Sequence, residues 1–111
     1  METNTWDARD AVTRGASYLD NVYPDWYHED NININTLAIQ LTNRCVLGQL
    51  FDAGSWESGF SRGIHELGLG VNDTEALGFT LPEMAGHFNW PLLTVAWINA
   101  IINRRTLEAS K

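Results

Sequence analysis

The sequence predicts a mainly α-helical protein, a compact single-domain bundle of four or five helices. Apolar residues recur at spacings of three and four in segments at both ends of the chain. Glycine and proline interrupt this pattern at intervals that suit short helices. A length of 111 residues with 44% apolar residues suits one core, so we expect residues 1–111 to form a single globular domain.

The first predicted helix covers about residues 7–23 and is amphipathic. One face carries its apolar residues, namely Ala8, Val12, Gly15, Leu19 and Val22. Pro24 should end this helix, because proline has no amide donor and disfavours helical geometry in the residue before it.

Residues 32–41 have a different pattern. Ile32 and Ile34 alternate with polar residues, and Leu37, Ile39 and Leu41 continue the alternation in the opposite phase. Alternation favours an extended segment. A minor two-stranded β element, made from residues 32–40 and 77–81, is therefore an open addition to the helical bundle.

Short helices are predicted in the middle of the chain. Thr42 or Asn43 would cap a helix that runs to about Phe51. Ser55 would cap the next helix, which Gly68 ends. Its apolar face holds Trp56, Phe60, Ile64 and Leu67.

Two shorter helical turns should follow. Asp73 would cap a single turn that Gly78 ends. Thr80 and Glu83 have the spacing of a capping box, with Pro82 in the first turn, which predicts another short helix.

The last predicted helix opens at residues 89–91 and closes at Arg104 and Arg105, whose charges suit the negative end of the helix dipole. Its apolar stripe is broad. One line holds Leu93, Trp97, Ala100 and Ile101, and a second holds Val95, Ile98 and Ile102. Such a helix either lies in the centre of the fold or buries one side against another chain.

Charge and composition exclude several classes of function. Fourteen acidic residues against seven basic ones leave a net charge of −7, which repels phosphates and anionic lipid head groups. We therefore expect no direct nucleic-acid binding and no membrane binding. A single cysteine and no apolar leader favour a cytoplasmic location.

Cys45 has two interpretations. At a helix start beside Arg44 its thiolate would be favoured, which would allow a small enzyme that uses Cys45 with His65 or His87. The neighbouring residues are apolar, however, and a buried lone cysteine usually behaves as a small hydrophobic residue. We predict a structural cysteine and no catalytic residue or cofactor, with Gly48 at a close helix approach and Gln49 tied to the backbone.

The stretch DWYHED, residues 25–30, contains four residues that can ligate metal. These are Asp25, His28, Glu29 and Asp30. Their spacing matches neither a zinc-finger nor a calcium-loop pattern. Neighbouring carboxylates on a loop are usually solvated, so we expect no metal site here.

The N-terminal third is the predicted contact region. Residues 1–35 contain seven acidic side chains and only two arginines, which favours a basic protein partner. Among five tryptophans, Trp56 and Trp97 fall on apolar faces, while Trp26 is predicted to form a contact surface or a lid over the core. The predicted partner-binding residues are Asp20, Tyr23, Asp25, Trp26, Tyr27, Glu29 and Asp30.

Several short motifs occur in a characteristic order. They are RGASYLD at 14–20, Pro-x-Trp at 24–26, CVLGQL at 45–50, Leu-Gly-Phe at 77–79 and a tryptophan-bearing C-terminal helix. In these the chain resembles a family of small uncharacterised proteins of actinobacteria and of the phages that infect them. The resemblance implies a cytosolic accessory protein, made by a phage, that acts on host machinery. It carries over no catalytic residue.

Three functions are compatible with these features. The leading hypothesis is a small acidic protein that modulates a host protein by occupying its surface. The alternatives are an enzyme or ligand-binding protein built on Cys45 with a histidine, and an assembly protein that self-associates through the C-terminal helix.

Overall fold

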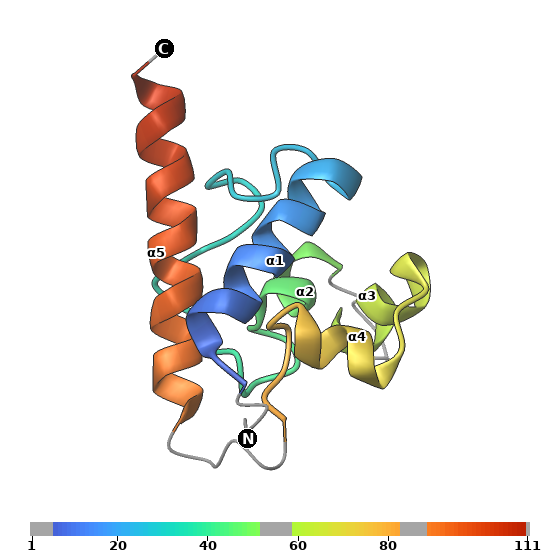
Figure 1. Cartoon of the computed structure of the whole chain (residues 1–111). Coiled ribbons are helices and arrows are strands. Elements are labelled where there is room, and N and C mark those ends of the chain that lie inside the picture. The colour runs from blue at the N-terminus through green and yellow to red at the C-terminus, as the bar shows by residue number, and fades with distance from the viewer. Residues whose placement is uncertain (1–5, 52–58, 83–88, 111) are drawn as a thin grey trace.

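Five helices form the regular structure in the computed structural model, which describes residues 6–51, 59–82 and 89–110 (Figure 1). They are α1 (Ala8–Val22), α2 (Val46–Leu50), α3 (Gly59–Leu67), α4 (Val71–Ala76) and α5 (Trp90–Ala109). This confirms the mainly α prediction. Trp56 and the predicted cap residue Glu83 lie outside the described residues.

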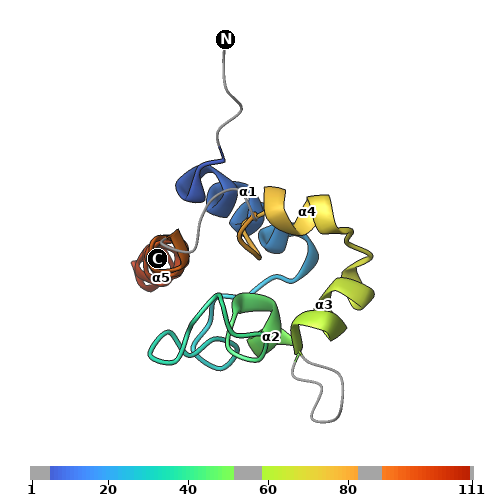
Figure 2. The ribbon, with the colours of Figure 1, turned by 90° about the horizontal axis from the view of Figure 1, so that it is seen from below.

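The helices α1 and α5 lie side by side, and both run from bottom to top in Figure 1, with α1 inclined to α5 (Figures 1 and 2). Asp7 caps α1, since its Oδ1 accepts from the amides of Arg9 (2.8 Å) and Asp10 (3.2 Å). α1 ends at Val22, just before Pro24, as predicted. Its buried face presents mostly small residues to the interior, namely Ala11, Val12, Gly15, Ala16 and Leu19.

α5 is longer than predicted, because it continues past Arg105 to Ala109. Its buried line is Leu93, Trp97 and Ile101, one residue per turn. None of the helices in the described ranges has both the length and the apolar character needed to cross a membrane.

Aromatic residues fill the centre of the core. Trp97 stacks on Phe79 with ring centroids 5.5 Å apart, and Trp26 meets Trp97 edge-on at 5.6 Å. The Trp97 Nε1 donates to the Gly78 carbonyl (2.6 Å), which satisfies the one polar atom of that side chain. The core therefore joins α5 to the segment before α2, through Trp26, and to the segment after α4, through Phe79.

The expectation of a β element is wrong for the described residues, which contain no strand. Residues 23–45 instead form successive turns with hydrogen bonds such as Ile32 N to His28 O (2.9 Å) and Arg44 N to Leu41 O (3.0 Å). The alternating pattern has a different cause: Ile32, Leu37 and Ile39 are buried one by one against the helices. The alternation of apolar and polar residues in this segment therefore reflects the burial of single side chains, and the segment pairs with no strand among the described residues.

α2 and α3 touch through glycines. A Cβ at Gly48 would overlap the Thr42 carbonyl oxygen, and a Cβ at Gly59 would overlap the Gly48 carbonyl oxygen. The predicted close approach at Gly48 is confirmed. The predicted cap of α2 is wrong: Cys45 is the N-cap, while the Asn43 side chain accepts from Gly59 N at the start of α3 (3.1 Å).

Two glycines end short helices as predicted. Gly68 after α3 and Gly78 after α4 have φ of 67° and 73°, a region that glycine adopts readily. The start of α4 differs from prediction, because Gly70 is the N-cap and Asp73 lies inside the helix, where its Oδ2 accepts from Gly70 N (2.9 Å).

Candidate functional site

The segment between α1 and α2 is held against the C-terminal turns of α5 by arginine. Arg105 Nε donates to the Tyr27 carbonyl (2.6 Å) and its Nη2 donates to the Ile32 carbonyl (2.7 Å). These bonds satisfy backbone oxygens that have no helix or sheet partner. Arg105, predicted to complement the dipole at the end of the helix, therefore also binds the backbone of a distant segment.

Asp20 lies at the centre of a second group of contacts. Arg104 donates to both of its carboxylate oxygens, with Nε to Oδ1 at 3.0 Å and Nη2 to Oδ2 at 2.8 Å. The Trp26 indole Nε1 also donates to Oδ1 (2.9 Å). The hydrogen bond from Arg104 is the main reason that the pKa of Asp20 lies below its ordinary value.

Trp26 lies inside the protein. The expectation that it presents a contact surface is wrong, because its side chain is 0% exposed. It packs against Trp97 and lies under the Arg104 guanidinium, whose Cζ is 5.8 Å from the ring centroid. Asp20 binds its one polar side-chain atom. The structure therefore assigns Trp26 to the core.

The other predicted contact residues divide into two groups. Tyr23 and Tyr27 are half-buried, with Tyr23 edge-on to Phe51 at 5.7 Å. Three carboxylates are exposed, namely Asp25, Glu29 and Asp30. The acidic residues of the predicted contact region therefore lie on the surface, whereas its aromatic residues are buried or half-buried.

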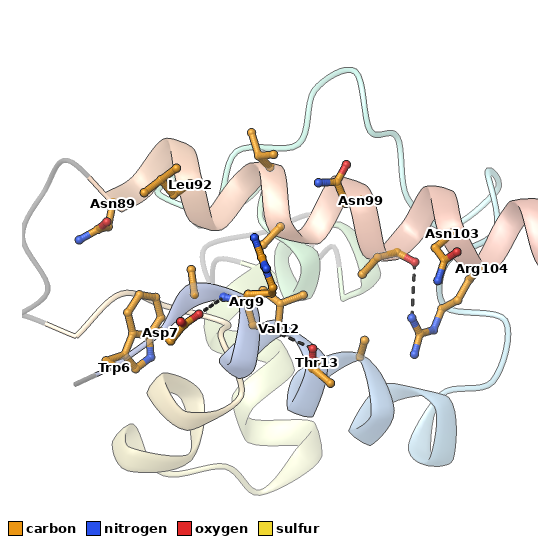
Figure 3. A pocket seen from close by; sticks show the side chains of 15 residues that line it. Trp6, Asp7, Arg9, Val12, Thr13, Asn89, Leu92, Asn99, Asn103 and Arg104 are labelled. Carbon is orange, nitrogen blue, oxygen red and sulfur yellow. Dashed lines mark hydrogen bonds between the residues drawn. The ribbon is translucent and has the colours of Figure 1, made fainter. Parts of the chain in front are cut away.

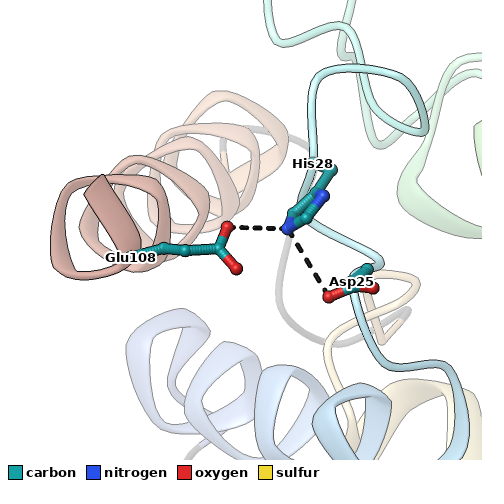
Figure 4. Close-up of side chains that lie close together, drawn as sticks. All are labelled: Asp25, His28 and Glu108. Carbon is teal, nitrogen blue, oxygen red and sulfur yellow. Dashed lines mark ion pairs between the residues drawn. The ribbon is translucent and has the colours of Figure 1, made fainter. Parts of the chain in front are cut away.

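Asp25, His28 and Glu108 come together where this segment meets the end of α5 (Figure 4). His28 Nε2 is 2.7 Å from Glu108 Oε1 and 3.5 Å from Asp25 Oδ1. Tyr27 donates its hydroxyl to the other Glu108 oxygen (3.4 Å). Sequence reasoning found two of the three residues, but it missed Glu108, which is distant in the sequence and carries no local signal.

A groove of about 930 Å³ runs between α1 and α5 (Figure 3). Small apolar side chains contribute to its lining from both helices, namely Ala8, Val12 and Ala16 from α1 and Ala96 and Ala100 from α5. Polar groups also line it, among them Asp7 and Thr13 near the start of α1 and Asn99 and Asn103 on α5. The groove is therefore shaped by two helices and has mixed chemistry.

Large aliphatic side chains stand exposed along α5. Leu92 is 59% exposed, Val95 51% and Ile102 44%. The spacings of three and seven residues place them on one face of the helix, away from Leu93, Trp97 and Ile101. Val95 and Ile102 belong to the second apolar line of the C-terminal helix described in the sequence analysis. That line therefore indicated the exposed apolar face of α5.

The Cys45 thiol is buried, with 1% of the residue exposed. Its Sγ accepts from Gly48 N (3.3 Å), and burial raises the pKa of the thiol to about 11. The group is consequently protonated at neutral pH, which does not suit a nucleophile. Gln49 is tied to backbone as predicted, because its amide bonds both Asn33 N (2.7 Å) and Asn33 O (3.3 Å).

A second cavity, of about 780 Å³, lies between α3, α4 and the start of α5. Its lining is mainly apolar and includes Phe60, Ile64, Leu69 and Trp90, with His65 and Glu75 among the polar residues.

The chain was compared with protein families, curated proteins and solved structures. No family model, no curated protein and no solved structure matches the chain.

Proposed function

We propose that this protein acts by binding another protein and that the α1–α5 groove, with the exposed aliphatic side chains of α5, is its docking surface. The observation that carries the proposal is the row of Leu92, Val95 and Ile102, each 44% to 59% exposed, beside a groove of about 930 Å³. An apolar row of this kind on the surface of a protein is typical of an interaction site. Covering each side chain would contribute roughly 1 kcal/mol.

The proposed occupant is an amphipathic helix of a partner with a net positive charge. Two neighbouring helices with small residues lining the groove between them let a third helix approach closely. Such a helix would place its apolar side chains over α5 and its polar side chains near Asn99, Asn103 and Thr13. The chain's net charge of −7 favours a basic partner.

The exposed carboxylates of Asp25, Glu29 and Asp30 support the same choice of partner. Surface charges of one sign accelerate the encounter with an oppositely charged protein more than they strengthen the final complex. On the resemblance to actinobacterial and phage proteins, the proposed partner is a host protein in the cytoplasm and the proposed effect is occupation of its surface.

The test is site-specific photo-crosslinking in host cells. A photoreactive amino acid replaces Val95 in one variant and Val71 in a control, since Val71 is also exposed, at 73%, but belongs to α4. We expect a crosslink from position 95 to one distinct host protein, at a segment with helical apolar spacing and net positive charge, and no such product from position 71. The Val95→Asp variant should then bind that protein at least tenfold more weakly, while Val71→Asp binds normally.

Two outcomes would contradict the proposal. A crosslink from position 95 only to a second copy of the chain would establish the self-association alternative, and size measurement by light scattering would then show a dimer that Val95→Asp dissociates. Equal products from positions 95 and 71 would show that the α5 face has no special role.

A further inference from the structure

We propose that Asp25, His28 and Glu108 form a binding site for a divalent transition-metal ion, with Zn²⁺ as the ion that fits best. The site is separate from the proposed docking groove, because none of its three residues lines that groove. The three residues each offer one ligand atom, and these atoms lie within 4.8 Å of one another. Figure 4 shows His28 between the two carboxylates, one from its own segment and one from the end of α5.

The three ligand atoms lie close enough together to reach one ion after small side-chain movements. Zn²⁺ binds imidazole nitrogen and carboxylate oxygen at about 2.0–2.1 Å in tetrahedral geometry, which separates neighbouring ligand atoms by roughly 3.3 Å. The two separations from His28 Nε2 are 2.7 Å to Glu108 Oε1 and 3.5 Å to Asp25 Oδ1, one on each side of that value. Small rotations of two exposed carboxylates would bring both onto one ion.

The ring nitrogen itself gives the second observation. His28 Nε2 is enclosed, and no group among the described residues forms a hydrogen bond with it. The Glu108 oxygen at 2.7 Å is close enough for an ion contact, but it does not satisfy the geometry of a hydrogen bond to the ring. With its proton on Nδ1, the ring would present the Nε2 lone pair to a cation held between the two carboxylate oxygens, in place of the ion pair with Glu108.

The mixed donor set selects the class of ion. One imidazole nitrogen with two carboxylate oxygens suits Zn²⁺ and its neighbours in the transition series, whereas Mg²⁺ and Ca²⁺ prefer oxygen ligands alone. Tyr27 donates to the remaining oxygen of Glu108 (3.4 Å), which would orient that carboxylate from outside the ligand set. His28 and Glu108 are partly exposed, so water can complete the coordination.

An ion at this position would fasten the segment after α1 to the last turn of α5. Arg105 already joins the same two regions through the Tyr27 and Ile32 carbonyls. The metal would thus add to an existing contact between regions distant in the sequence, and binding would raise the thermal stability of the chain.

The test uses tag-free protein with isothermal titration calorimetry and thermal unfolding. We expect one Zn²⁺ ion per chain, a melting temperature several degrees higher with Zn²⁺ in excess, and no comparable shift with Mg²⁺. Co²⁺ should give the visible absorption bands of a tetrahedral complex with nitrogen and oxygen ligands.

Matched variants assign the site. His28→Ala should weaken Zn²⁺ binding at least tenfold, while His65→Ala, at a histidine of α3, leaves it unchanged. Glu108→Gln should also weaken binding at least tenfold. Glu29→Gln, at an exposed carboxylate next to His28 in the sequence, should not weaken it. Circular dichroism would confirm that each variant is folded. Zn²⁺ binding that survives His28→Ala or Glu108→Gln, or an absence of any Zn²⁺ binding to the folded wild-type protein, would overturn the proposal.

Discussion

The pair of helices α1 and α5 and the segment at residues 23–45 are both buried against the same core, but they are held there in different ways. The two helices satisfy their own backbone groups and meet through side chains placed by a regular spacing. The segment forms only turns, and side chains from α2 and α5 bond its backbone. Apolar spacing is therefore enough to form the helix pair, whereas the segment also needs side chains from distant helices to bond its backbone.

Three side chains replace the partner strand that residues 23–45 lack. Arg105 binds the Tyr27 and Ile32 carbonyls, Gln49 binds both backbone groups of Asn33, and the Thr94 hydroxyl accepts from Ile39 N (3.2 Å). The Gln49 bonds are exposed, whereas those of Arg105 and Thr94 are partly buried, and a buried backbone group left without a partner costs about 1–3 kcal/mol. These residues therefore stabilise the segment as a sheet ladder would.

The substitution Trp26→Ala should destabilise the protein most, and it tests whether the segment contributes to the core as strongly as the helices do. Trp26 is fully buried against Trp97, so its removal should lower the free energy of unfolding by about 3–5 kcal/mol. Chemical denaturation measures this loss. Leu92→Ala, at an exposed position of α5, is the control and should change the stability by less than about 0.5 kcal/mol.

A small effect of Trp26→Ala, equal to that of the control, would contradict this comparison. It would mean that the segment can leave the core at little cost, and it would return Trp26 to the role of a surface contact that the sequence suggested.

The substitution Arg105→Gln tests the backbone contacts alone. It removes hydrogen bonds to two carbonyls, and we expect a loss of about 2 kcal/mol in the free energy of unfolding. Hydrogen exchange should become faster for amides in residues 26–32 and stay unchanged in α1. Arg62→Gln is the control, because Arg62 pairs with Glu66 on an exposed face of α3 and should contribute less than about 0.5 kcal/mol. Faster exchange spread equally over α1 would show that the two regions are not held separately.

Sequence reasoning succeeded where a local rule decides the structure. The end of α1 followed from Pro24, and the ends of α3 and α4 followed from Gly68 and Gly78. The close approach at Gly48 was also predictable, because a glycine inside a short apolar helix has few other uses.

The same reasoning failed where contacts between distant residues decide the outcome. The alternating pattern at residues 32–41 predicts a strand, but the segment is fixed by α2 and α5, whose positions a local pattern does not contain. The charged neighbours of Trp26 predict a surface position, yet one of those charges, Asp20, binds its indole and allows its burial. Glu108 joins the candidate metal cluster only through the fold.

The substitution Asp20→Asn should have the weakest effect of the three, and it tests the charge that pairs α1 with α5 beside Trp26 of the segment. Arg104 lowers the pKa of Asp20 in the folded protein, so the ionised carboxylate stabilises the fold at pH values above its ordinary pKa of 3.8. That stabilisation is lost as the pH falls through the lowered pKa, because both the folded and the unfolded states then hold the proton. Asp20 is partly exposed, and we expect wild type to exceed the variant by only about 1 kcal/mol at pH 7.

Urea unfolding at pH 7, 5 and 3 measures this difference, which should be constant between pH 7 and 5 and smaller at pH 3. Asp30→Asn, at an exposed acidic residue of the segment after α1, serves as the control and should change stability by less than about 0.5 kcal/mol at every pH. The side-chain amide oxygen that Asp20→Asn introduces can still accept from the Trp26 indole, so the substitution keeps that hydrogen bond and removes the charge together with the Arg104 hydrogen bond to the second oxygen. A difference that stays the same at pH 3 would assign the effect to packing around Trp26, and the contact between Asp20 and Arg104 would then join α1 to α5 without a contribution from charge.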